Sequence, residues 1–186
     1  MHRRHLIALA AAAAPAAIAM QAFAQDAMPA MGEAETTHAE MTGMVGALSL
    51  LQSKLALENA SDEKVKMFAE WEVAEQQTIG DILKSMMEDG MDDAQGALQP
   101  PTDEEARAML DDEGTAKLEE LQGLSGAEFD QAYVAANLEG HQKLLAIQET
   151  YLESGTMREH LSVAKLARGM ITEHIAHLEE LQSMVG

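Results

Sequence analysis

The fold is decided by residues 125–185, which read SGAEFDQAYVAANLEGHQKLLAIQETYLESGTMREHLSVAKLARGMITEHIAHLEELQSMV. Apolar residues recur there at three- and four-residue steps on both sides of Gly155, which is the spacing of amphipathic helices. Ser125 followed by Glu128 has the pattern of a capping box, Gly155 ends the first helix, and Thr156 is placed to cap the second. The stretch therefore predicts two long helices joined by a tight turn.

The residues before this stretch predict a second helical hairpin and a long connection. Apolar periodicity indicates helices over residues 38–60 and 61–89. Thr102 with Glu105 opens a short helix within the connection that leads to Ser125. This helix is expected to be interrupted near Gly114 and to resume through Leu118 and Leu121. No strand pattern is present, and the four long helices are matched in length. The sequence thus predicts an all-α four-helix bundle with a short extra helix between its second and third helices.

The connection between the second and third long helices is long enough to run the length of the bundle. In that arrangement the helices over residues 61–89 and 125–154 are parallel to each other. A simple up-and-down bundle is the alternative. We favour the crossover, because it brings the inward polar residues described below closer to one level.

Residues 1–24 have the composition of a secretory signal peptide. Arg3 and Arg4 precede an alanine-rich apolar run, and Ala22-Phe23-Ala24 is a small-x-small pattern that places cleavage after Ala24. The run is too short and too rich in alanine for a membrane-spanning helix. The sequence predicts a periplasmic protein, exported by the general secretory route rather than the twin-arginine route that Arg3-Arg4 also resembles. We expect residues 25–37 to form a flexible tail and residues 38–186 to form the bundle domain.

The composition limits the partners of the protein. The chain has 32 acidic and 12 basic residues and a formal net charge of −20, and loss of Arg3 and Arg4 with the signal makes it more negative still. Nucleic acid is disfavoured because like charge repels its phosphates, and no second apolar stretch predicts membrane insertion. A divalent cation, a basic envelope protein or a second copy of the chain would be compatible. Because cysteine is absent, disulfides, thiolate metal sites and thiol nucleophiles are excluded.

Several polar residues occupy helix positions that face the predicted core. They are Glu72 and Glu75 in the second long helix, His141 in the third, and His174 in the fourth. His177 joins them at the edge of the apolar stripe, which is the row of core-facing residues along the fourth helix. Carboxylates and imidazoles that converge in a bundle core are the ligands of iron, manganese or zinc. Buried glutamates need a compensating cation, which a metal ion or protonated histidines would supply. Two interpretations stay open: a metal site, or a hydrogen-bonded polar layer that fixes the register of the helices.

The chain resembles an exported bacterial family known as domain of unknown function 4142. The matching features are Phe68-Ala69, Phe129-Asp130-x-x-Tyr133, His141 and His174. The resemblance implies a ferritin-like helical bundle and export, and it implies no activity. The family commonly has Asp-His where this chain has Glu75-Gln76, so a site that uses that histidine is altered here. The family's proline before the last histidine is also missing, with Gly169 near its place.

These observations lead to three hypotheses about function. The favoured one is a non-enzymatic periplasmic helical-bundle protein, related to the envelope or to stress, whose inward polar residues are structural. The first alternative is a bundle that binds iron, manganese or zinc through its inward glutamates and histidines. The second is an acidic interaction module for a basic envelope partner. No catalytic or organic-cofactor residue is assigned, because the sequence has no nucleophile triad, phosphate-binding loop or glycosidase carboxylate pair.

Overall fold

The computed structural model describes residues 31–87 and 96–186, and these residues form helices and no strand. The helices are α1 (Glu33–Asn59), α2 (Glu63–Met87), α3 (Asp103–Ala108), α4 (Asp112–Gln122), α5 (Gly126–Ser154) and α6 (Arg158–Val185). The all-α prediction is confirmed for this part of the chain. The predicted signal peptide and the predicted end of the second helix near residue 89 lie outside the described residues. None of the described helices combines the length and apolar character needed to cross a membrane.

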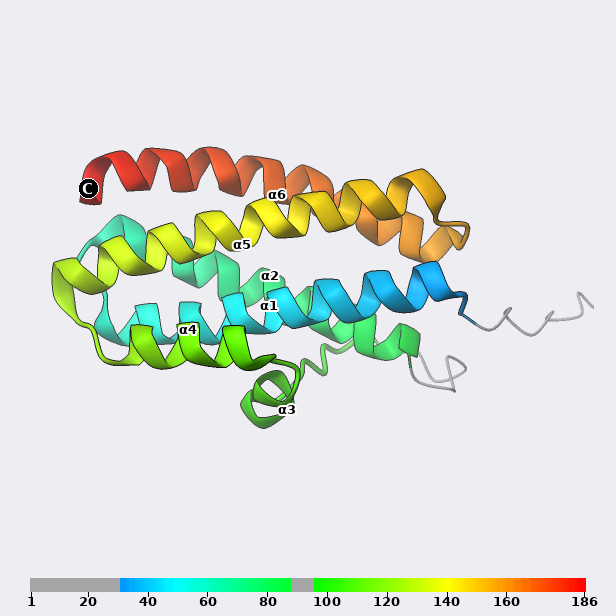
Figure 1. The fold of residues 1–186 in the computed structure, drawn as a ribbon, viewed down its shortest axis with the longest axis horizontal. Coiled ribbons are helices and arrows are strands. Elements are labelled where there is room, and N and C mark those ends of the chain that lie inside the picture. Colours follow the sequence, from blue (N-terminus) through cyan, green and yellow to red (C-terminus); the bar gives the residue numbers. More distant parts are fainter. Residues whose placement is uncertain (1–30, 88–95) are drawn as a thin grey trace, which may run out of the picture. The chain divides into compact units, whose positions relative to one another are not determined.

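The four long helices pack side by side, and α1 lies at the junction of the two hairpins (Figure 1). The direction of α5 relative to α1 follows from two contacts. His38 near the start of α1 meets Gln148 near the end of α5, whereas Ser53 near the end of α1 meets Tyr133 near the start of α5. Helix α2 follows α1 after the short connection 60–62 and packs back against it, so α2 is also antiparallel to α1. Helices α2 and α5 are therefore parallel. The favoured crossover is therefore confirmed.

A buried carboxylate fixes the end of the bundle where α2 and α5 both begin. Asp130, which is 2% exposed in the first turns of α5, accepts hydrogen bonds from the backbone N–H groups of Ser61 and Asp62 at 2.9 and 3.0 Å. Asp62 in turn accepts from the N–H of Val65 and so caps α2. Asp130 therefore joins two helix starts that lie 68 residues apart in the chain.

The crossover carries two helices rather than the single interrupted one that the sequence predicts. The Thr102–Glu105 capping box is present and opens α3. The break falls at residues 109–111, before Gly114 rather than at it, because Asp111 accepts a hydrogen bond from the N–H of Gly114 and starts α4. Both short helices pack against α1 (Figure 1).

Three helix starts differ from expectation, two in position and one in capping. The first helix starts at Glu33 rather than His38, so residues 33–37 are helical and do not belong to a tail. Ser125 stands at the start of α5, but its side chain accepts no capping hydrogen bond. Thr156 does not cap the last helix, which begins at Arg158, and instead donates hydrogen bonds to Glu35 on α1. Gly155 ends α5 as expected.

Polar layers interrupt the apolar core at two levels. One apolar cluster surrounds Phe68, Phe129 and Tyr133, and another contains Leu144 and Ile171. Along α5 and α6, one polar layer lies between these two apolar clusters, and it is called the first polar layer. The second lies near the start of α1 and the turn between α5 and α6, at the opposite end of the bundle from Asp130.

Candidate metal centre

Three side chains from three helices meet in the first polar layer. Glu72 from α2, His141 from α5 and His174 from α6 are 0%, 1% and 7% exposed. The Oε2 atom of Glu72 lies 3.3 Å from Nε2 of His141 and 3.1 Å from Nδ1 of His174. The two ring nitrogens are 3.2 Å apart. One carboxylate oxygen and two imidazole nitrogens thus form a nearly equilateral triangle.

This triangle has the dimensions of one face of a metal coordination sphere. Nitrogen and oxygen ligands lie about 2.0–2.2 Å from zinc, so neighbouring ligands are about 3.0–3.4 Å apart in tetrahedral or octahedral geometry. All three distances in the cluster fall within that range. An ion at bonding distance from the three atoms would lie just outside their plane. Its remaining coordination positions would be free for water or another small ligand.

The opposite nitrogen of each ring faces a hydrogen-bond acceptor. Nδ1 of His141 lies 2.8 Å from the backbone oxygen of Asn137, and Nε2 of His174 lies 3.2 Å from Oε2 of Glu75. These contacts favour an N–H at each outer nitrogen, which leaves a lone pair on each nitrogen that faces Glu72. Metal-binding histidines have this arrangement, in which an outer acceptor fixes the tautomer and the ring orientation.

The two oxygens of Glu72 have different partners. Oε1 accepts hydrogen bonds from the hydroxyl of Ser49 at 2.6 Å and from Nε2 of Gln76 at 2.9 Å. Oε2 is buried and receives no hydrogen bond, although both ring nitrogens are close to it. Ser49 also lies 2.8 Å from Oδ1 of Asn137, so the network continues to α5. The carboxylate is therefore held through Oε1 while Oε2 stays available to a cation.

The electrostatics of the cluster require a positive charge. Burial disfavours ionisation of Glu72, but the neighbouring imidazoles of His141 and His174 outweigh it and lower the pKa of this carboxyl far below 4.5. Burial lowers the pKa of His174, whereas Glu72 and Glu75 raise it, with a net pKa of about 9. Without a metal ion, a proton on His174 provides the charge that compensates Glu72.

The structure separates the sequence-predicted residues into two groups. Glu72, His141 and His174 come together as a group able to hold a metal ion. Glu75 contacts His174 from outside the triangle, with 32% of its side chain exposed. His177 is exposed, its ring centroid lies 6.0 Å from that of Trp71, and it is not part of the group able to hold a metal ion. One turn of α6 beyond His174, it lies on the solvent side of the stripe.

Two supporting residues, Ser49 and Gln76, were missed by sequence reasoning. Gln76 replaces a histidine that is common in the family, and its side chain donates a hydrogen bond to Glu72. Ser49 lies between two leucines and gives no signal alone. Ser49 is informative only together with the other polar residues of its helix. His38, Thr42, Ser49 and Ser53 are all buried and lie along one face of α1. Polar residues along a buried face predict a polar network inside the bundle.

The second polar layer contains His38, Gln148 and Thr42, with His160, Tyr151 and Glu35 close by. Nε2 of His38 lies 2.7 Å from Oε1 of Gln148, and the ring of His38 stacks on Tyr151. His160 is buried, and neither of its ring nitrogens has a hydrogen-bond partner. This layer does not bring three metal-ligating atoms together.

The fold and the site define an all-α bundle whose core holds a buried carboxylate with two imidazoles. The chain matches the family model described as "Domain of unknown function (DUF4142)" over residues 11–181, and it belongs to this family. Comparisons with curated proteins and with solved structures gave no match. The family resemblance stated from Phe129, Asp130 and Tyr133 is thus confirmed.

Proposed function

We propose that this protein is a periplasmic metal-binding bundle in which Glu72, His141 and His174 hold one divalent ion. The observation that carries this proposal is the triangle of three buried donor atoms, each belonging to a side chain whose other polar atom contacts a partner outside the triangle. A bundle with one crossover is also the topology of ferritin-like proteins, many of which bind metals in their cores. We include the ferritin-like assignment in the proposal on that basis.

The donor set favours zinc, iron(II) or manganese(II). Two imidazoles and one carboxylate suit these ions, and the absence of cysteine removes the ligands that select copper(I) or iron–sulfur clusters. Structural zinc sites use four protein ligands, whereas sites with three leave a position for water or substrate. The cluster therefore has the ligand number of an open site. We propose reversible binding of the ion and assign no reaction to it.

Metal binding competes with a proton in this proposal. An ion at the triangle requires neutral histidines, so binding at neutral pH releases the proton that His174 otherwise carries. We therefore expect binding to weaken as the pH falls. The polar layer and the metal site are then two states of one cluster, with either a proton or an ion compensating Glu72.

The decisive experiment measures metal content in the mature protein after anaerobic incubation with zinc, iron(II) or manganese(II) and desalting. We expect one ion per chain for at least one of the metals. His174→Ala is expected to weaken binding by about 100-fold or more, because it removes a ligand. His177→Ala is the matched control, since it removes an exposed histidine of the same helix. A wild-type protein that retains none of the three metals would refute the proposal, as would equal losses in the two variants.

Glu75 is proposed to position His174 rather than to bind the ion. Glu75→Gln keeps a hydrogen-bond acceptor but removes the charge that makes His174 a stronger ligand. We expect an affinity about 10- to 100-fold lower, with the same stoichiometry, in competition with a chelator. Glu70→Gln, an exposed change on the same helix, should leave the affinity unchanged. Loss of stoichiometry in Glu75→Gln would instead place Glu75 among the ligands.

Periplasmic location belongs to the proposal and rests on the pattern of residues 1–24. The mature protein recovered from the periplasmic fraction of an expressing bacterium is expected to begin at Gln25. N-terminal sequencing checks this. Recovery of the uncleaved chain from the cytoplasm alone would contradict it.

A further inference from the structure

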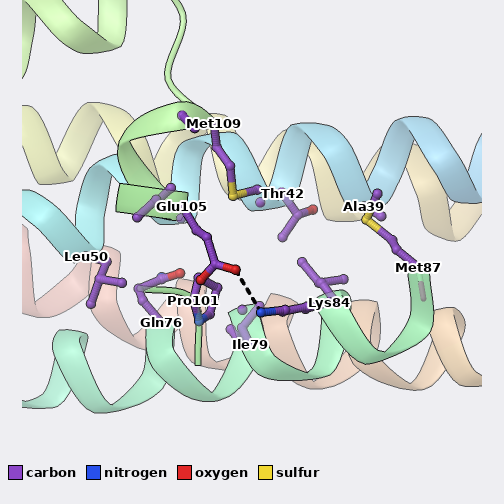
Figure 2. A pocket seen from close by; sticks show the side chains of 17 residues that line it. Ala39, Thr42, Leu50, Gln76, Ile79, Lys84, Met87, Pro101, Glu105 and Met109 are labelled. Atoms are coloured by element: carbon purple, nitrogen blue, oxygen red, sulfur yellow. Dashed lines mark hydrogen bonds and ion pairs between the residues drawn. The ribbon is translucent and has the colours of Figure 1, made fainter. Parts of the chain in front are cut away.

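A cavity separate from the metal triangle lies between α1, α2 and α3 (Figure 2). Its volume is about 390 Å³, within the range of sites for small molecules. Small residues of α1, among them Ala39 and Ala47, form one wall, and Ile79 and Leu83 of α2 form another. Pro101 and Met109 close the third side from the crossover. The cavity is therefore lined mainly by hydrocarbon from three separate segments.

Two polar atoms at the inner wall, Oγ1 of Thr42 and Nε2 of Gln76, are already engaged elsewhere. The hydroxyl of Thr42 accepts a hydrogen bond from Gln148 at 3.0 Å. The amide nitrogen of Gln76 donates to Glu72 in the metal cluster. Water inside the cavity consequently has few free partners at this wall. Displacing such poorly bonded water by an apolar molecule is favourable.

The charges at the cavity compensate each other. Among the described residues that line it, the charged side chains are Lys84 and Glu105, whose atoms Nζ and Oε1 lie 2.9 Å apart. Figure 2 shows this ion pair joining α2 to α3 beside the cavity. An anionic ligand would have to compete with Glu105 for Lys84 in a chain of net charge −20, and a cationic ligand would have to compete with Lys84 for Glu105. The lining therefore favours an uncharged ligand.

We propose that this cavity is a binding site for a neutral, mainly aliphatic molecule such as a medium-chain alcohol. Met87 and Met109, both at the edge of the cavity and partly exposed, have flexible side chains that can adapt to such a ligand. The site uses none of the three metal-ligating side chains. The proposal is thus independent of the metal-binding function.

The test is a fluorescence titration of the mature protein with the neutral apolar probe N-phenyl-1-naphthylamine. We expect a saturable increase with one probe per chain, and displacement by 1-decanol at a concentration about tenfold or more below that needed for decanoate. Ala108→Phe adds an aromatic ring to the lining and is expected to weaken probe binding by about tenfold or more. Ala116→Phe, at an exposed alanine of α4 outside the lining, is the matched control and should bind as the wild type.

Three results would overturn this inference. They are a wild-type protein without saturable probe binding, equal weakening in both alanine variants, and displacement by decanoate in preference to 1-decanol. Both alanines are exposed, and thermal melts establish that the two variants are folded. His174→Ala is expected to retain probe binding, so failure of the metal proposal would leave this result unchanged.

Discussion

Replacing His174 by leucine is expected to lower the free energy of unfolding of the metal-free protein by about 3–5 kcal/mol. The substitution removes the cation that compensates Glu72, whose side chain is completely buried. Leucine has a similar volume, so little of the loss comes from a cavity. Urea denaturation at neutral pH in the presence of a chelator measures the effect.

The double variant Glu72→Leu/His174→Leu separates the effect of an uncompensated buried charge on stability from the effect of altered packing. Because no buried charge is left, we expect it to lose less stability than His174→Leu alone. His177→Leu should change the stability by less than about 0.5 kcal/mol, as is usual for an exposed position. If His174→Leu is no more damaging than His177→Leu, the ion pair has no structural role and only the metal interpretation of the cluster survives.

The pH dependence of the same variant has a definite sign. The pKa of His174 is raised from 6.5 to about 9 in the folded protein. The stability it contributes is therefore fully present below pH 6.5 and is lost as the pH rises through about 9. The difference between wild type and His174→Leu should shrink in alkali. A difference that persists above that range would show that packing, and not the ion pair, is responsible.

The sequence was sufficient to find the cluster because its members replace apolar residues. Glu72 and His174 occupy stripe positions of amphipathic helices, and His141 lies between two apolar strips, so each must face the interior. Apolar periodicity predicts burial less well for a residue at the edge of an apolar stripe. A small rotation of the helix there determines whether the side chain faces the core or the solvent. His177 had such a position and is exposed, whereas Glu75 was placed on the stripe itself and contacts the cluster through His174.

Long-range contacts set the features that the sequence did not predict. Residues 33–37 have no large apolar side chain. This turn of helix is instead held by Glu35, which accepts hydrogen bonds from Thr156 and Met157, far away in the sequence. Thr156 fails to cap α6 for the same reason, since its hydroxyl and N–H are both used by Glu35. The length of the crossover allowed parallel helices, but the contacts between α1 and α5 establish them. Local patterns predicted the number of long helices, and distant contacts determine their ends.

Acidification is expected to open the end of the bundle where α1 begins, before the end fixed by Asp130. Glu35 is 3% exposed, and its Oε1 accepts hydrogen bonds from the N–H of Thr156 at 3.0 Å, the N–H of Met157 at 3.3 Å and the hydroxyl of Tyr151 at 3.1 Å. The N–H of Thr156 contributes most to lowering the pKa of Glu35, burial opposes the change, and the net pKa is about 2 instead of 4.5. The stability that Glu35 contributes is present above pH 4.5 and is lost as the pH falls toward 2.

His38 and His160, at the end of the bundle where α1 begins, also lower the stability of the folded protein in acid. Burial lowers the pKa of both His38 and His160 from 6.5, so the folded state binds fewer protons than the unfolded state once the pH falls below that value. Protonation would also place charge on buried rings in which Nδ1 of His38 and both nitrogens of His160 have no hydrogen-bond partner. We therefore expect stability to decline first below pH 6.5 and again below 4.5.

Hydrogen exchange followed by mass spectrometry locates this opening. Residues 33–42 and 150–160 are expected to lose protection at about pH 4, while the first turns of α2 and α5 stay protected. Glu35→Gln should lower stability at neutral pH by about 2 kcal/mol, since a neutral acceptor binds the four donors, two of them from Thr156, more weakly. It should also flatten the decline below pH 4.5. Glu33→Gln, an exposed change in the same turn, should alter neither property. Uniform loss of protection along the bundle would mean that acid unfolds the domain cooperatively, and that Glu35 and the two histidines do not define a separate unit.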